Sequence, residues 1–159
     1  MSKLKKLVLP ALCSILILSA CSKDDNPTPP KTLYTETGVM ATTQEFPAIP
    51  SPSAATGSFD VTYNKTTRLL TWKVNWVGLS DTITASHIHG TAKLGASAGV
   101  KVGFDIPTKS VLTGSYSGST TVDGVLIKED SLLMGFYYLN IHTKKNTGGE
   151  IRGQMNFTP

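Results

Sequence analysis

Two neighbouring runs of the chain, residues 58–64 and 69–77, alternate apolar and polar side chains with a period of two. Successive side chains of a β-strand point to opposite faces, so each run predicts a strand with one buried face. A four-residue loop, residues 65–68, would join the strands as an antiparallel hairpin. The register that brings the two apolar faces together pairs Tyr63 with Leu70, Val61 with Trp72, and Phe59 with Val74.

Further short β-prone stretches follow at a spacing of about ten residues, separated by Gly, Ser, Thr and Pro. They are ITASHIH, VKVGFDI, SVLTGSY and STTVDGVL. Residues 128–134 differ, because charged residues precede a Leu-Leu-Met run and Gly135 can adopt a left-handed cap, which predicts one short helical turn. We therefore expect residues 33–159 to form a single all-β domain, an antiparallel β-sandwich or barrel-like fold with Greek-key, Ig-like connections.

A second hairpin is predicted near the C-terminus, where residues 136–143 and 150–157 flank a turn rich in Asn and Gly. Its register follows from sorting polar side chains onto one face and apolar side chains onto the other. The sorted pairs are His142 with Glu150, Asn140 with Arg152, Tyr138 with Gln154, and Ile141 with Ile151. Slipping by one residue would mix the two classes on both faces.

The three histidines of the chain are not scattered. His87 and His89 lie two residues apart in SHIHG, so they project from one side of a strand, about 6–7 Å apart. His142 belongs to the polar face of the second hairpin. If the two strands are neighbours, these imidazoles form a polar patch together with Asn140, Glu150 and Arg152. Three neutral nitrogen donors on a rigid sheet could bind zinc or copper, so His87, His89 and His142 are the candidate metal ligands.

Two other interpretations of this patch stay open. Histidines hydrogen-bond at both ring nitrogens, so the patch could be a structural polar network, with Arg152 paired to Glu150. The other interpretation is a catalytic site, although Ser86 points to the face opposite His87, and no second carboxylate is placed as a base. The sequence indicates no catalytic residue, and zinc or copper is the candidate cofactor. The expected function is non-enzymatic, with metal binding as the first alternative and a metal-dependent enzyme as the second.

Residues 1–20 have the layout of a secretion signal: three lysines precede an apolar run of about a dozen residues, and small residues follow. The run is too short for a membrane-spanning helix of about 20 residues. It ends at LSAC, which resembles a bacterial lipoprotein box and implies cleavage before Cys21 with lipid on its thiol. We expect fatty acyl chains such as palmitate to anchor the mature protein to a membrane without crossing it.

The predicted cleavage also changes the charge of the chain. It leaves 12 of the 15 basic residues against 11 acidic ones, so the exported protein is near neutral. It therefore lacks the cluster of positive charge that indicates binding of nucleic acid.

Residues 21–32 are polar and proline-rich, which predicts a disordered tether after the lipidated Cys21. The SKDD string that follows Cys21 is similar to export signals of bacterial surface lipoproteins. We therefore expect the protein to be located in the cell envelope, anchored at the outer membrane and displayed on the cell surface.

Several motifs of the chain together resemble the CHRD domain, an extracellular module named after chordin. They are found at residues 44–47, 55–57, 69–79, 85–90, 132–135 and 138–154, and include HIHG, NIHT and GGEIRGQ. The resemblance extends from about Tyr34 to Phe157. It implies a β-rich extracellular module without an established enzymatic activity, whose ligand would be an extracellular protein or glycan. Thr147 stands where the family usually has proline, which leaves the turn less preorganised.

Overall fold

The computed structural model describes residues 30–51 and 53–158, so the predicted signal peptide, Cys21 and most of the predicted tether lie outside the described residues. The described strands are β1 (Leu33–Ala41), β2 (Thr56–Asn64), β3 (Leu69–Val77), β4 (Ile83–Gly90), β5 (Val100–Gly103), β6 (Gly114–Thr121), β7 (Tyr137–Thr143) and β8 (Ile151–Gln154). A 3-10 turn, η1 (Thr42–Gln44), follows β1, and the helix α1 (Glu129–Leu133) precedes β7.

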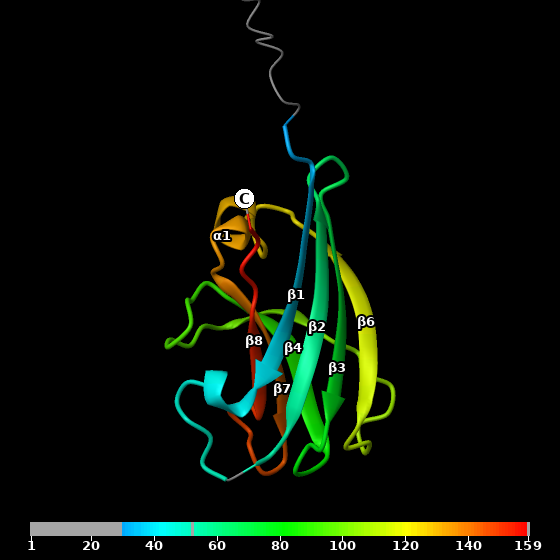
Figure 1. Cartoon of the computed structure of the whole chain (residues 1–159), viewed down its shortest axis with the longest axis vertical. Helices are drawn as coiled ribbons and strands as arrows, with labels where there is room; N and C mark the ends of the chain where they lie inside the picture. Colours follow the sequence, from blue (N-terminus) through cyan, green and yellow to red (C-terminus); the bar gives the residue numbers. More distant parts are fainter. Residues whose placement is uncertain (1–29, 52, 159) are drawn as a thin grey trace, which may run out of the picture. The chain divides into compact units, whose positions relative to one another are not determined.

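The eight described strands form one antiparallel sheet with the order β5-β4-β7-β8-β1-β2-β3-β6 (Figure 1). The sheet curves until its two edge strands approach each other, and aromatic side chains bridge the gap. Phe104, just after β5, stacks on Tyr116 of β6 with ring centroids 5.5 Å apart, and on Trp72 of β3 at 5.0 Å. This nearly closed, barrel-like sheet confirms the predicted all-β antiparallel class.

Both predicted hairpins have the expected register. In β2–β3, the pairs of Tyr63 with Leu70, Val61 with Trp72, and Phe59 with Val74 are confirmed. In β7–β8, the pairs of Tyr138 with Gln154, Asn140 with Arg152, and Ile141 with Ile151 are confirmed. Side-chain alternation therefore determined strand pairing in both parts of the sheet, because a one-residue slip would move every apolar side chain to the wrong face.

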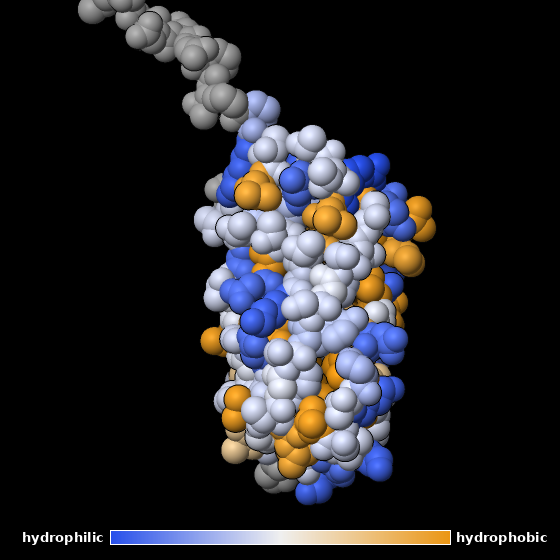
Figure 2. All heavy atoms as spheres, turned by 90° about the vertical axis from the view of Figure 1, so that its right-hand side faces the viewer, coloured by the Kyte–Doolittle hydropathy of each residue, from blue (hydrophilic) through white to orange (hydrophobic). Residues whose placement is uncertain are grey.

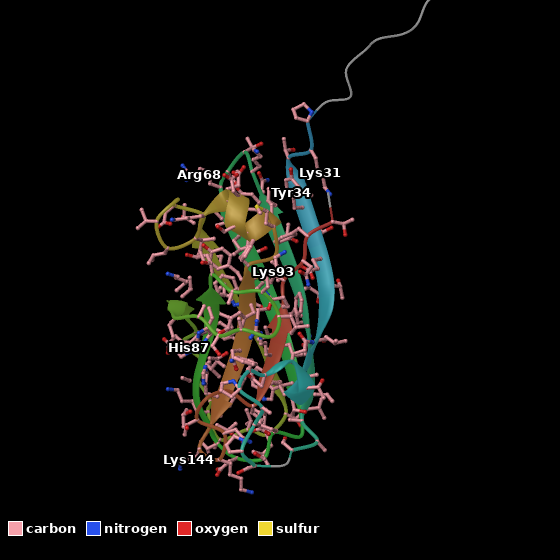
Figure 3. The ribbon with its side chains drawn as sticks, turned by 90° about the vertical axis from the view of Figure 1, so that its left-hand side faces the viewer. Lys31, Tyr34, Arg68, His87, Lys93 and Lys144 are labelled. Carbon is pink, nitrogen blue, oxygen red and sulfur yellow. The ribbon has the colours of Figure 1, made fainter. Side chains whose placement is uncertain are left out.

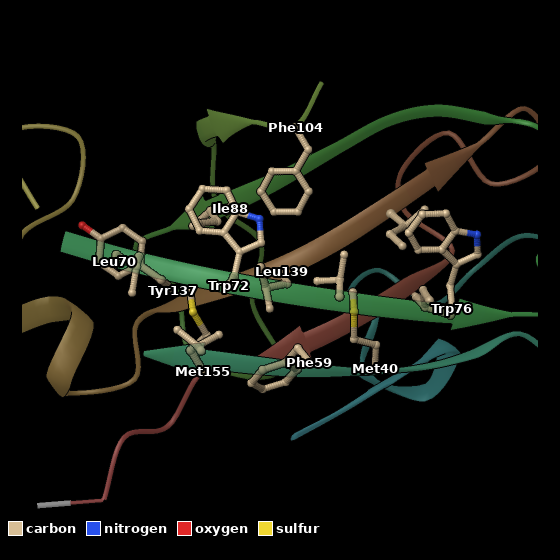
Figure 4. Packing of buried hydrophobic residues seen from close by; sticks show 14 of the residues in the cluster. Met40, Phe59, Leu70, Trp72, Trp76, Ile88, Phe104, Tyr137, Leu139 and Met155 are labelled. Atoms are coloured by element: carbon tan, nitrogen blue, oxygen red, sulfur yellow. The ribbon is translucent and has the colours of Figure 1, made fainter. Parts of the chain in front are cut away.

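The apolar faces of the strands meet in a continuous core inside the curved sheet (Figure 4). Phe59 of β2 lies in this core with 1% of its surface exposed. Gly38 of β1 and Gly153 of β8 face its ring, and a Cβ atom at either position would collide with it. The two glycines therefore let the ring lie flat against neighbouring strands, and full burial of such a side chain stabilises a fold by about 1.5–3 kcal/mol.

The helix α1 confirms the single helical turn predicted near residues 128–134. Leu132 anchors it in the core, and Gly135, with φ +74°, ends it in the left-handed conformation expected from the sequence. The Glu129 carboxylate accepts a hydrogen bond from the Tyr63 hydroxyl at 2.6 Å and pairs with the Lys65 ammonium at 2.6 Å. The turn is thus fixed to the β2–β3 hairpin.

On the side of the molecule that carries β6, polar and weakly polar residues cover most of the surface, and apolar side chains occur in small separate groups (Figure 2). Within residues 30–51 and 53–158, no helix is long and apolar enough to cross a membrane.

Candidate functional site

The β7–β8 hairpin is buried on both of its faces. Every residue of β7 and of β8 is buried, whereas in β3 buried residues alternate with more exposed ones. Leu139, Ile141 and Ile151 face the core. The opposite face of β4, β7 and β8, which we call the outward face, is covered by residues 45–51, 91–99 and 144–150, which hydrogen-bond to its side chains or to one another. Its side chains are those of His87, His89, Tyr138, Asn140, His142, Arg152 and Gln154.

The structure brings the three predicted metal ligands together on the outward face, because β4 pairs directly with β7. One ligand nitrogen from each of His87, His89 and His142 lies within 4.8 Å of the other two. His87 Nδ1 is 3.2 Å from His142 Nε2, and His89 Nε2 is 3.3 Å from the same atom. We call these residues the three-histidine cluster. His89 and His142 are buried and His87 is half-buried, at the edge visible in Figure 3.

Loop carbonyls fix the tautomers of two of the three rings. His89 Nδ1 lies 2.9 Å from the carbonyl oxygen of Ala98, and His142 Nδ1 lies 2.9 Å from that of Thr147. A carbonyl only accepts, so both Nδ1 atoms carry the hydrogen, and in the neutral rings both Nε2 atoms present lone pairs. This carbonyl-to-imidazole arrangement is the one that usually orients histidine ligands of metals.

All three rings are held in the neutral form. Burial lowers the pKa of His87 to about 4, and the neighbouring imidazoles of His142 and His89 add to the effect. Burial also lowers the pKa of His142 and of His89, although the hydrogen bonds to the loop carbonyls partly oppose this. Arg152 further lowers the pKa of His89 through its charge. Neutral imidazole is the form that binds metal ions.

Arg152 does not form the expected ion pair with Glu150, and this part of the predicted network is wrong. Its guanidinium donates to the carbonyl oxygens of Ala96 at 2.7 Å and Lys93 at 3.1 Å, and to the side chain of Gln154. Loop carbonyls and Gln154 therefore bind the two terminal nitrogens of the guanidinium, whereas Nε has no partner within the described residues. These backbone acceptors belong to irregular loops. Sorting polar and apolar side chains onto the two faces of a strand does not predict the path of such loops.

Glu150 instead binds hydroxyl and amide donors from three other segments. Its carboxylate accepts hydrogen bonds from Ser53 Oγ at 2.5 Å, from Ser80 N at 2.7 Å and Oγ at 3.0 Å, and from Thr143 Oγ1 at 2.6 Å. Burial by itself raises the pKa of Glu150, but these donors outweigh it and lower the pKa overall. The carboxylate is a fully buried junction for loops, separate from the histidines.

Asn140 contacts a residue to which the sequence assigned no role, Glu45. Asn140 Nδ2 donates to Glu45 Oε2 at 3.2 Å. A Cβ atom at Gly149 would lie 2.6 Å from Asn140 Oδ1 and 2.7 Å from Glu45 Oε1, so both oxygens border the same glycine. Within the described residues, neither oxygen has a hydrogen-bond partner. A proton on Glu45 would remove the buried negative charge at this position.

The pKa of Glu45 agrees with this geometry. Burial raises it to about 7, although the hydrogen bond from Asn140 and the charge of Arg152 both oppose the rise. The carboxyl group is thus protonated in a large fraction of molecules at neutral pH. The only sequence signal at this position was the QEFP motif, which shows no periodicity and marks no obvious partner.

The arrangement can hold a metal ion through three imidazole nitrogens. In the described part of the chain, the only group of His, Cys, Asp and Glu side chains with this convergence is the three-histidine cluster. The donor set is uncharged and of intermediate softness, which suits zinc and copper.

Comparison with known proteins gives one match. The sequence model of the CHRD domain matches residues 37–155, which includes the whole outward face. No curated protein and no solved structure matches the chain.

Proposed function

This chain belongs to the CHRD domain family, and we propose that it acts as a non-enzymatic binding module of the cell envelope whose three-histidine cluster binds zinc or copper. The family supports a binding or structural module. The layout of residues 1–21 supports export and lipid attachment at Cys21, at the outer membrane and on the cell surface. An extracellular protein or glycan is the expected partner.

The metal-binding part of this proposal depends on one observation, the contact between the Nε2 atoms of His89 and His142. Both atoms carry lone pairs, because their Nδ1 hydrogens are donated to loop carbonyls, yet they lie only 3.3 Å apart. Two acceptors at this distance repel each other unless a cation lies between them. His87 adds a third nitrogen to the same point.

A purely structural polar network explains this arrangement less well. In such a network, donors and acceptors alternate, since an acceptor without a donor costs about 1–3 kcal/mol when buried. His87 Nδ1 can donate to His142 Nε2, but this leaves His89 Nε2 facing an acceptor that is already occupied. A metal ion satisfies all three nitrogens at once.

Elemental analysis of the full mature protein, purified without added metal and then exposed to zinc or copper, tests the metal site. We expect close to one metal ion per chain, and loss of binding in His142→Ala. Asn75→Ala, on the polar face of β3, is the matched control and should bind like the wild type. Binding well below one equivalent in the folded wild type, for both metals, would overturn the metal site.

A separate experiment tests the anchor. Cys21→Ser should release the protein from the membrane fraction into the soluble fraction, because lipid attachment needs the thiol. Protease treatment of intact cells then distinguishes surface display from a location beneath the outer membrane. Membrane retention of a correctly cleaved Cys21→Ser protein would contradict lipid anchoring.

A further inference from the structure

A three-layer stack lies directly behind one of the proposed ligands. The guanidinium carbon of Arg152 is 3.5 Å from the ring centroid of Tyr138. The Tyr138 ring in turn stacks on the His89 ring, with centroids 5.0 Å apart and planes within 5°. A permanent positive charge is therefore held close to the metal ligands, with one aromatic ring between them.

We propose that this Arg152–Tyr138–His89 stack makes the three-histidine cluster selective for the monovalent cuprous ion over divalent zinc. The inference rests on the proposed function, since it names which ion the same site takes.

The first argument concerns charge. The converging donors are three neutral imidazoles, and no Asp, Glu or Cys of the described residues joins them. A bound cation therefore meets no compensating anion among its ligands, while it feels the field of Arg152. Repulsion grows with the charge of the ion, so a dication is disfavoured twice as strongly as a monocation.

The second argument concerns the environment of Arg152. Its guanidinium is fully buried and is held by the neutral carbonyl groups of Ala96 and Lys93 rather than by a carboxylate. Glu45 is the acidic group close enough to affect it, and burial raises the pKa of Glu45 to about 7. The positive charge is therefore only partly compensated at neutral pH, and the low local dielectric extends its range.

The third argument concerns rigidity. The Tyr138 hydroxyl accepts a hydrogen bond from the Ala98 amide at 3.1 Å, and the Ala98 carbonyl oxygen lies 2.9 Å from His89 Nδ1. One loop residue thus fixes both stacked rings. The phenol ring keeps water out of the space between guanidinium and imidazole, so the charge acts on the site without a screening layer.

The fourth argument concerns coordination number. Zinc held by three histidines completes a tetrahedral site with a ligand from solvent, so zinc binding here depends on a water molecule reaching the ion. Imidazole nitrogen suits copper as well as zinc. The cuprous ion also accepts three-coordinate geometry, which needs no solvent ligand. The cluster supplies three nitrogen ligands.

The test compares the two ions on the full mature wild-type protein. Under anaerobic conditions with ascorbate, competition with bicinchoninate gives the Kd for the cuprous ion, and competition with a colorimetric zinc chelator gives the Kd for zinc. We expect the protein to keep its cuprous ion when the same free concentration of zinc is added. Displacement of the cuprous ion by zinc would overturn the inference while leaving the proposed metal site intact. Failure of both ions to bind would overturn both.

Two variants then test the stack itself. Removing one unit charge about 10 Å away should lower the preference for the cuprous ion over zinc by about tenfold, at an effective dielectric constant of about 20. We expect this loss in Arg152→Gln and a smaller change in Arg152→Lys, which keeps the charge. An unchanged preference in a folded Arg152→Gln protein would contradict the role of the stack. If Arg152→Gln does not fold, the wild-type competition still decides the inference.

Discussion

In the β2–β3 hairpin, side chains that point away from the core, such as Asp60 and Lys73, are exposed, whereas on the corresponding face of the β7–β8 hairpin Asn140 and Arg152 are buried. Both hairpins have the same alternation of apolar and polar residues and the same kind of antiparallel register. The difference comes from the loops. Residues 45–51, 91–99 and 144–150 cover the outward face of β7–β8, and no comparable contact covers Asp60 and Lys73 within the described residues.

The alternation of apolar and polar residues therefore locates the core, but it does not determine whether the polar face of a strand is exposed or buried. A polar face open to water keeps its side chains solvated. A polar face under loops must find a partner for every group, because an unsatisfied buried polar group costs about 1–3 kcal/mol. Loop carbonyls and hydroxyls supply many of these partners on the outward face. Within the described residues, Glu45 Oε1, Asn140 Oδ1 and Arg152 Nε lack one, and in the three-histidine cluster acceptors meet acceptors.

The largest effect should come from the core that both hairpins share. Phe59→Ala removes a ring that is 1% exposed and is enclosed by two glycines, so we expect a loss of about 3–5 kcal/mol in the free energy of unfolding. Urea denaturation measures this loss. Val39→Ala in β1, where the side chain is 66% exposed, is the control and should change stability little. Equal effects of the two substitutions would contradict the assignment of the core.

The next effect should distinguish buried from exposed carboxylates. Glu150→Gln replaces an acceptor of hydrogen bonds from Ser53, Ser80 and Thr143, so we expect a loss of about 2 kcal/mol at pH 7. The isosteric change Asp60→Asn on the open face should cost far less.

The pH dependence of Glu150→Gln follows from the lowered pKa of Glu150. A carboxyl group with a lowered pKa in the folded state stabilises the fold above the unfolded value of 4.5, and this contribution is lost as the pH falls through the folded pKa. The difference between wild type and Glu150→Gln should therefore shrink on acidification below about pH 4.5. A constant difference from pH 7 to pH 3 would show that the ionised carboxylate is not what stabilises this junction.

Glu45→Gln should show the opposite pH dependence. The pKa of Glu45 is raised from 4.5 to about 7, so its stabilising contribution is complete below pH 4.5 and is lost as the pH rises through 7. Glutamine cannot ionise and keeps an oxygen that can accept from Asn140 Nδ2. Relative to the wild type, the variant should gain about 1–2 kcal/mol between pH 5 and pH 8, measured by urea denaturation at both values. No relative gain would mean that Glu45 is already ionised at pH 5.

The smallest effect should occur on the open polar face. Lys73→Ala removes an exposed side chain opposite Asp60, and we expect a change within about 0.5 kcal/mol. Thermal unfolding at matched salt concentration measures it. A loss of more than about 1 kcal/mol in the free energy of unfolding would contradict the distinction between the open polar face of β2–β3 and the covered polar face of β7–β8.

The predictions from sequence were accurate where one periodic pattern controlled the outcome. Alternation fixed the strand pairs of both hairpins, and the charged segment before Leu132 with the glycine after it marked the helical turn. The convergence of the three histidines followed from His87 and His89 being two residues apart on a strand next to His142. The hairpin registers and the helical turn needed only local geometry, whereas the convergence of the histidines also needed β4 to lie next to β7, which was a condition of that prediction.

Other features were not readable from the sequence, for identifiable physical reasons. The strand β1 was not predicted, because Met40 is its only fully buried side chain and Gly38 occupies a core position that Phe59 fills from the neighbouring strand. The loop carbonyls that bind Arg152 and the Glu45 carboxylate that binds Asn140 lie in a covering loop and at the end of η1, and no period relates those positions. Every residue has a backbone carbonyl group, so the sequence does not indicate which carbonyl groups bind Arg152 or orient the histidines.

The two carbonyl groups that orient His89 and His142 belong to different loops, at Ala98 and at Thr147. Any ion that locks the two rings also locks the backbone at both places, so amide hydrogen exchange in residues 91–99 and 144–150 should slow together when the site fills. The occupancy of a largely buried cluster would then change the dynamics of two loops at the surface of the molecule.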